Sequence, residues 1–187
     1  MIFSREADRA LPSVVYLYDE PSSSSLRIGE IAEFLKKKIH NLDVRTRKEF
    51  LSFHSSDVEE LARKLASAKI RGPQGVQEEV EPLPLEVEFE KKTIREPHRR
   101  LSGLLYDGFL LQNLFRELIP EKELHTSLAH IAFTNRIFCT YDKGDNRYHA
   151  RVIICGYPSL ISTSGIVEAP AKPREFYVAK QKYIAAG

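Results

Sequence analysis

Three side chains able to bind an anion or transfer a proton alternate along one segment of the chain. In the stretch DKGDNRYHAR, from Asp142 to Arg151, a strand would place Arg147, His149 and Arg151 on one face. Two guanidinium groups disfavour protonation of an imidazole between them, so His149 could bind an anion with them or act as a base. The alternative is a structural face whose cations pair with Asp142 or Asp145.

Hydroxyl groups follow the same segment. Ser162 and Ser164 stand just before Gly165 in SLISTSGI, and Arg174 comes farther on. Hydroxyls and exposed amides beside a glycine can form an anion-binding cradle. The same composition is typical of an ordinary turn, in which serine bonds its own backbone. Polar loops after buried strands often carry sites in α/β folds, so these four residues are candidate ligand-binding residues.

Metal binding has weaker support in the sequence. His130 and His149 could approach each other across a hairpin, and two histidines with an aspartate could bind zinc. Nothing in their spacing is specific to metal binding. The sequence contains no HExxH, no GxxxxGK[ST], no GxGxxG and no GxSxG. We therefore expect no metal site and no cofactor from the motifs of this chain.

The elements that would carry these residues alternate between strands and helices. Apolar spacing and polar caps predict strand 14–18, helix 23–39, strand 42–47, helix 57–70, helix 101–119, strands 128–142 and 147–162 joined by KGDN as a β-hairpin, and helix 173–187. This order predicts an α/β (mixed α+β) fold class. We expect one domain over residues 1–187, with a mixed β-sheet and flanking helices.

Residues 71–97 interrupt this order with an acidic segment that contains prolines. The segment QEEVEPLP is broken by two prolines, and residues 85–90 then alternate apolar residues with glutamates. Alternation of this kind predicts a strand with one solvated face, and the charges suit the edge of a sheet. We expect 71–97 to be an excursion within the single domain.

Composition excludes several classes of partner. The net charge is +2, so we do not expect nucleic-acid binding, although basic residues cluster at 36–38 and 98–100. No segment reaches the roughly 18 apolar residues of a membrane span. The N-terminus has charged residues where a secretory signal would have its apolar core. Cys139 and Cys155 lie in strand-like text and are expected to be buried reduced thiols. We therefore expect a cytoplasmic protein without membrane association.

Part of the chain resembles a known family. The segments FTNRIFCTYD and RYHARVIICGYPSLISTSGIVEAPAKPREFY resemble an uncharacterised archaeal family described as metallopeptidases, most strongly over 128–177. That family is distantly similar to the archaemetzincins, zinc peptidases with a mixed sheet under an active-site helix. The resemblance implies a metzincin-like β-α-β-α…α-β-β-α order, with 148–162 as the strand before that helix. In those enzymes the helix carries HExxHxxGxxH, whereas REFYVAKQKYIAAG contains no histidine.

Two function classes follow. The resemblance implies a metallopeptidase-related, hydrolase-like protein without a complete catalytic zinc site in this chain. Zinc would then require a missing C-terminal segment or a partner chain, and a homo-oligomer is the other expected assembly. The alternative is a binding module for a small anion or a peptide carboxylate, which would use the Arg147, His149 and Arg151 face with the Ser162–Gly165 loop.

Overall fold

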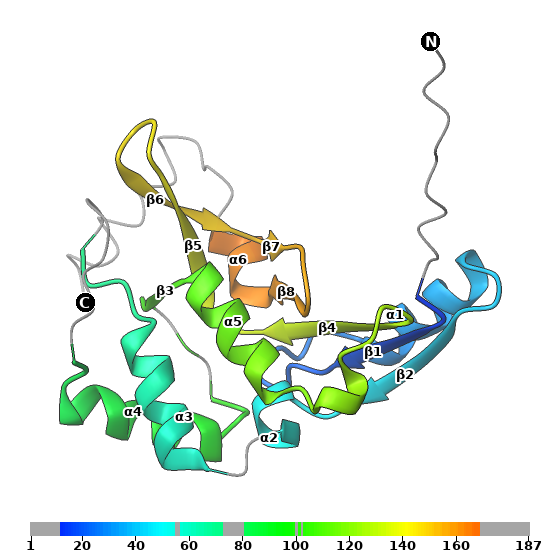
Figure 1. Cartoon of the computed structure of the whole chain (residues 1–187), viewed down its shortest axis with the longest axis horizontal. Helices are drawn as coiled ribbons and strands as arrows, with labels where there is room; N and C mark the ends of the chain where they lie inside the picture. Colours follow the sequence, from blue (N-terminus) through cyan, green and yellow to red (C-terminus); the bar gives the residue numbers. More distant parts are fainter. Residues whose placement is uncertain (1–11, 55–56, 73–80, 100, 102, 169–187) are drawn as a thin grey trace.

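The chain folds around two mixed β-sheets (Figure 1). The computed structural model describes residues 12–54, 57–72, 81–99, 101 and 103–168. The first sheet has the order β2-β1-β4-β8-β7 and the second has the order β3-β5-β6. The strands are β1 Val14–Tyr18, β2 Asp43–Arg47, β3 Leu105–Asp107, β4 Leu128–Thr134, β5 Ile137–Asp142, β6 Arg147–Arg151, β7 Ile153–Ile154 and β8 Ser159–Ser162.

Parallel pairing dominates the first sheet. β1 is parallel to both β2 and β4, β4 is parallel to β8, and β7 alone adds antiparallel pairing, against β8. In the second sheet β3 is parallel to β5 and β5 is antiparallel to β6. The expected α/β fold class with a mixed sheet is confirmed.

Helices flank the sheets on both sides. Within the described residues they are α1 Ile28–Lys38, α2 Phe50–His54, α3 Val58–Ser67, α4 Pro84–Arg95, α5 Gly108–Leu118, α6 Thr163–Glu168 and the short 3-10 helix η1 Glu121–Glu123. The alternation of β1 sorts its side chains between two cores. Val15 and Leu17 pack with Ala32 of α1, whereas Tyr16 and Tyr18 join the larger core built with the other helices.

The N-terminal half largely follows the sequence prediction. Both strands and both long helices form where apolar spacing placed them. Asp57 caps α3, because its carboxylate accepts hydrogen bonds from the amides of Glu59 and Glu60. The short helix α2 was not expected, and it buries Phe50 and Leu51.

The strand predicted at 85–90 is wrong, because these residues belong to helix α4. Pro84 occupies the first turn, where a missing amide hydrogen costs nothing, and Glu86 accepts a hydrogen bond from the amide of Leu83. Glu90, expected on a solvated face, is 0% exposed. It forms ion pairs with Lys69 and Arg136, which tertiary folding alone brings to it.

The helix predicted over 101–119 begins later than expected. Residues 105–107 form β3, and α5 starts at Gly108 under a cap from Asp107, whose carboxylate accepts from the amides of Phe109 and Leu110. Over a segment of only three residues, the spacing of apolar residues does not distinguish a strand from a helix. Tyr106 is buried in β3, where β5 pairs with it.

The two long C-terminal strands are each divided. Residues 128–142 form β4 in one sheet and β5 in the other, and 147–162 form β6, β7 and β8. The break after β4 lies at Asn135 and Arg136, both buried, whose side chains are held by polar partners from other segments. Gly156, with φ of 150°, and the following Pro158 interrupt the second strand. The hairpin with KGDN is confirmed for β5 and β6.

Three further expectations meet different outcomes. The segment Ser162–Gly165, expected as a turn or a ligand-binding loop, instead contains the last residue of β8, Ser162, and the first turn of α6, which begins at Thr163. Cys139 is buried as expected, whereas Cys155 is exposed. Helix 173–187 and Arg174 lie outside the described residues. No helix in the described part of the chain has the length and apolar character needed to cross a membrane.

Candidate functional site

A crevice of about 640 Å³ opens at the carboxyl ends of β1, β4 and β8. From β1 the chain crosses to β2 on one side, and from β4 it proceeds toward β8 on the other. Loops that leave adjacent parallel strands in opposite directions leave a gap between them, and this is where open α/β sheets bind ligands. The second sheet closes the crevice with Leu105, Ile137 and Ala150, one residue from each strand.

Glu20 is the buried charged group of the crevice. It lies two residues after the end of β1, and only 2% of its surface is exposed. One carboxylate oxygen accepts from the amide of Ser22 at 2.9 Å. The other lies 3.1 Å from Oγ1 of Thr163, at the start of α6. The loop after β1 and the helix after β8 are thus joined through one carboxylate.

Hydroxyl and amide groups form much of the remaining lining. Asn135 follows β4, and its Nδ2 donates to Oγ of Ser22 at 2.9 Å and to the carbonyl of Arg99 at 2.8 Å. The serines of the loop after β1 continue along the wall from Ser22 to Ser25. Leu101 and Val167 add apolar surface. The crevice therefore offers hydrogen-bonding groups beside apolar contacts, as small-ligand pockets commonly do.

The candidate residues around α6 have separate positions. The Ser162 hydroxyl donates to the carbonyl of Arg136 and accepts from the amide of Gly165, both at 2.8 Å. A side chain at Gly165 would lie 2.9 Å from the carbonyl of Arg151, so the close approach of α6 to β6 requires glycine here. Ser164, by contrast, lines the crevice. Of the serines predicted to bind a ligand, Ser164 is the one that faces this space.

The predicted face of β6 exists. Arg147 and Arg151 are exposed and His149 is half-buried between them. Arg151 donates from Nε to Oγ1 of Thr140 on β5 at 2.8 Å. The face belongs to an edge strand, whereas Ser162 is buried. Anion binding on this face stays a prediction.

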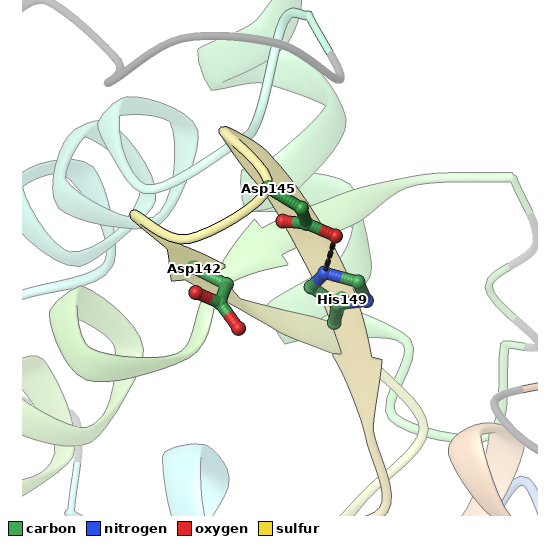
Figure 2. Close-up of side chains that lie close together, drawn as sticks. All are labelled: Asp142, Asp145 and His149. Atoms are coloured by element: carbon green, nitrogen blue, oxygen red, sulfur yellow. Dashed lines mark hydrogen bonds and ion pairs between the residues drawn. The ribbon is translucent and has the colours of Figure 1, made fainter.

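A group of possible metal ligands lies at the end of this hairpin. One ligand atom from each of Asp142, Asp145 and His149 lies within 4.8 Å of the others (Figure 2). Nε2 of His149 is hydrogen-bonded to Asp145 at 2.7 Å, and Asp142 accepts from the amide of Gly144. Both carboxylates are exposed, and none of the three residues lines the crevice.

His130 lies in a different cluster, centred on Tyr18. The Tyr18 oxygen is 2.8 Å from Nε2 of His54, from Nδ1 of His130 and from Nη1 of Arg47. Arg47 also binds both carboxylate oxygens of Glu123. Burial raises the pKa of Tyr18, and burial lowers the pKa of His54 to about 4 and that of His130 below its usual value. Both imidazoles are therefore neutral at pH 7.

The hydrogen bonds of this cluster fix the two tautomers. A phenol donates once and accepts twice, and Arg47 uses one acceptor position. Nε2 of His130 lies 3.4 Å from the carbonyl of Glu123 and must donate there, so its Nδ1 accepts from Tyr18. Nε2 of His54 then donates to Tyr18. Both ring nitrogens of His130 are engaged inside the protein, and the structure does not bring His130 near His149, which pairs with Thr140 of β5.

Sequence reasoning did not select Glu20 or Asn135, and it included Thr163 only as part of the Ser162–Gly165 loop. A signal for Glu20 was present, because it follows a predicted strand in the turn DEPSSSS. The rule that sites lie at the carboxyl ends of parallel strands would have pointed to it. Asn135 could not have been found in this way, because the sequence predicts a single strand over 128–142 and therefore no strand end beside Asn135.

Comparison with known proteins identifies the family. Residues 11–186 match the model of a family described as "Probable metallopeptidase family (DUF6775)". No curated protein and no solved structure matches the chain.

Proposed function

Because the chain belongs to this probable metallopeptidase family, we propose that it binds a peptide in the crevice and does not carry a complete catalytic zinc site of its own. The observation that supports binding is the crevice itself, about 640 Å³ at the point where the strand order reverses. Its serine hydroxyls and the Asn135 amide suit the polar backbone of a peptide. Leu101, Leu105 and Val167 suit apolar side chains.

The residues that the structure describes do not fit a catalytic zinc ion. Such a site uses three protein ligands, most often with two or more histidines, and leaves one position for water. In the described part of the chain, one group of three potential ligands comes together, at Asp142, Asp145 and His149. It supplies one imidazole, whose Nε2 is already bonded to Asp145. The sequence has no HExxH, and we derive no hydrolytic step from these residues.

Hydrolysis, under this proposal, requires zinc ligands from another segment or chain. A partner subunit or a homo-oligomer could supply them, as expected from the sequence. The archaeal source, the cytoplasmic location and the absence of nucleic-acid binding belong to the same proposal and rest on the sequence features described above.

Peptide binding can be measured with an introduced fluorophore. The chain contains no tryptophan, so Val167→Trp places a single indole at the crevice, at a position that is 62% exposed. Phe34→Trp on α1, at a position 59% exposed, is the matched control outside the crevice lining. Short peptides without aromatic residues should change the emission of Val167→Trp saturably and leave that of Phe34→Trp unchanged.

Metal analysis completes this test. Protein purified without chelator should contain far less than one zinc ion per chain, and added zinc should not produce peptide hydrolysis. Stoichiometric zinc would refute the proposed absence of a zinc site. A Val167→Trp signal that responds to no peptide would refute peptide binding.

A further inference from the structure

We propose that the crevice selects a ligand group bearing a positive charge, an ammonium or a guanidinium, and that Glu20 is the residue that recognises it. The inference rests on the proposed function and adds the chemical class of the bound group.

Glu20 is a buried carboxylate that has no cationic partner in the described part of the chain. Its surface is 2% exposed, and its hydrogen bonds come from a backbone amide and a hydroxyl. Among the described residues, no lysine, arginine or histidine forms an ion pair with it. A buried charge is costly unless it is paired, so most buried carboxylates contact a cation. Its counter-charge must come from elsewhere, and the crevice that it lines is the open route to it.

Among the described residues, the remaining lining contains no lysine, arginine or histidine. The charged residues among the described lining are Glu20 and Glu168. The other polar groups are hydroxyls and the Asn135 amide, which can accept hydrogen bonds from an ammonium or a guanidinium. An anionic ligand would instead meet the Glu20 carboxylate with no described cation beside it. The crevice therefore favours a basic side chain or a free amino terminus of a peptide.

Among the described residues, the Arg136 guanidinium could balance Glu20 from a distance. Both residues line a small cavity of about 10 Å³, and Glu20 and Asn135 line this cavity as well as the crevice. The Arg136 guanidinium is committed to Glu90, at 3.1 Å, and its Nε has no hydrogen-bond partner. Lys69 also pairs with Glu90, so this buried group carries one excess positive charge. If that excess already balances Glu20, the crevice needs no cation from a ligand.

Glu20→Gln distinguishes these two arrangements. The amide keeps the shape and the hydrogen bonds, because its oxygen can accept from Ser22 while its NH₂ donates to Thr163, whose hydroxyl can turn to the carbonyl of Thr134, 3.2 Å away. We expect the ligand-free variant to melt at the same temperature as the wild type or higher, since an unpaired buried charge is removed. A lower melting temperature would show that Glu20 balances Arg136, and would overturn the inference.

The binding test uses peptides that differ in charge and little else. In the Val167→Trp background, Ac-Gly-Arg-Gly-NH₂ is compared with its citrulline analogue, which is close in shape and uncharged. We expect the arginine peptide to bind about 10- to 100-fold more tightly, the range for a hydrogen bond to a charged group. Glu20→Gln should abolish this difference. Glu33→Gln, at a side chain that is 74% exposed on α1, should preserve it.

The outcomes separate this inference from the proposed function. Equal affinity for the two peptides would overturn charge selection and leave peptide binding standing. If neither peptide binds, peptide binding fails, and argininamide then tests charge selection alone. Argininamide should raise the melting temperature of the wild type and not that of Glu20→Gln, and an equal response of both proteins would overturn the inference.

Discussion

At the scale of single residues, the Tyr18 cluster shows how burial sets protonation. His54 and His130 share one phenol oxygen, and neither ring is fully exposed. Burial is the largest cause of their lowered pKa values, and the nearby Arg47 guanidinium acts in the same direction. The Glu123 carboxylate acts in the opposite direction, but the pKa of His54 still lies below its usual value. Folding therefore favours the neutral imidazoles.

This arrangement predicts a pH-dependent stability. Because the pKa of His54 is about 4 in the folded protein and 6.5 ordinarily, the unfolded state binds more protons between these values. The free energy of unfolding should be constant above about pH 6.5 and fall as the pH approaches 4. After allowance for partial exposure, His54 accounts for about 1–2 kcal/mol of this fall. Urea denaturation between pH 7 and pH 5 measures it.

Two histidine variants assign the effect. His54→Gln should reduce the slope of stability against pH, with a residual slope from His130, whose pKa is shifted in the same direction. The exposed His40→Gln should retain the slope of the wild type. An unchanged slope in His54→Gln would contradict the assignment.

At the scale of elements, the start of α6 depends on one close approach. The residue after β8 turns directly into the helix because Ser162 caps it and Gly165 lets it touch the backbone of Arg151. Both features hold Thr163 and Ser164 at the crevice. The segment that read as a loop is therefore a fixed part of the site wall.

A pair of glycine substitutions tests this contact. An added methyl at Gly165 would lie 2.8 Å from Ser162 and 2.9 Å from the Arg151 carbonyl, so Gly165→Ala should destabilise the protein by about 1–3 kcal/mol. At Gly29 of α1 nothing lies within 4 Å, and Gly29→Ala should stabilise by up to about 1 kcal/mol. Thermal or denaturant unfolding measures both. Equal effects of the two substitutions would show that the contact is not tight.

At the scale of the whole molecule, a buried ionic group connects distant parts of the chain. Glu90 of α4 meets Lys69 at 2.8 Å and Arg136, between the two sheets, at 3.1 Å. The Tyr106 hydroxyl of β3 donates to the same carboxylate. Burial opposes the charge of Glu90, and the two cations outweigh burial, so its pKa lies below the usual value. This group fixes α4 against the junction of the sheets.

Removing the central charge should be costly. Glu90→Gln leaves Lys69 and Arg136 buried without a counter-ion, which typically destabilises by about 3–5 kcal/mol. The neighbouring Glu88→Gln removes a carboxylate whose side chain is 65% exposed and should cost less than about 1 kcal/mol. Urea denaturation of both variants gives the comparison. A loss below about 1 kcal/mol in Glu90→Gln would mean that solvent reaches the group.

The sequence alone determined those features that depend on local spacing. β1, β2, α1 and α3 follow from apolar periodicity and capping residues, and the KGDN hairpin follows from its turn residues. The family was also identified at this level, over 128–177, and the comparison extends it to 11–186. Each of these features is encoded within a few neighbouring residues or in a recognisable segment.

Only the tertiary structure decided the remainder. The alternation at 85–90 predicts a strand when its glutamates are assumed to be solvated, whereas the segment is a helix in which Glu90 is buried against Lys69 and Arg136. The division of 128–142 between two sheets depends on Arg136, whose partner is 46 residues away in the chain. The crevice combines residues from 20 to 168, so no local pattern could reveal it. The pairing of distant charges and the order of the strands depend on contacts between residues far apart in the chain, and the spacing of residues in the sequence does not reveal such contacts.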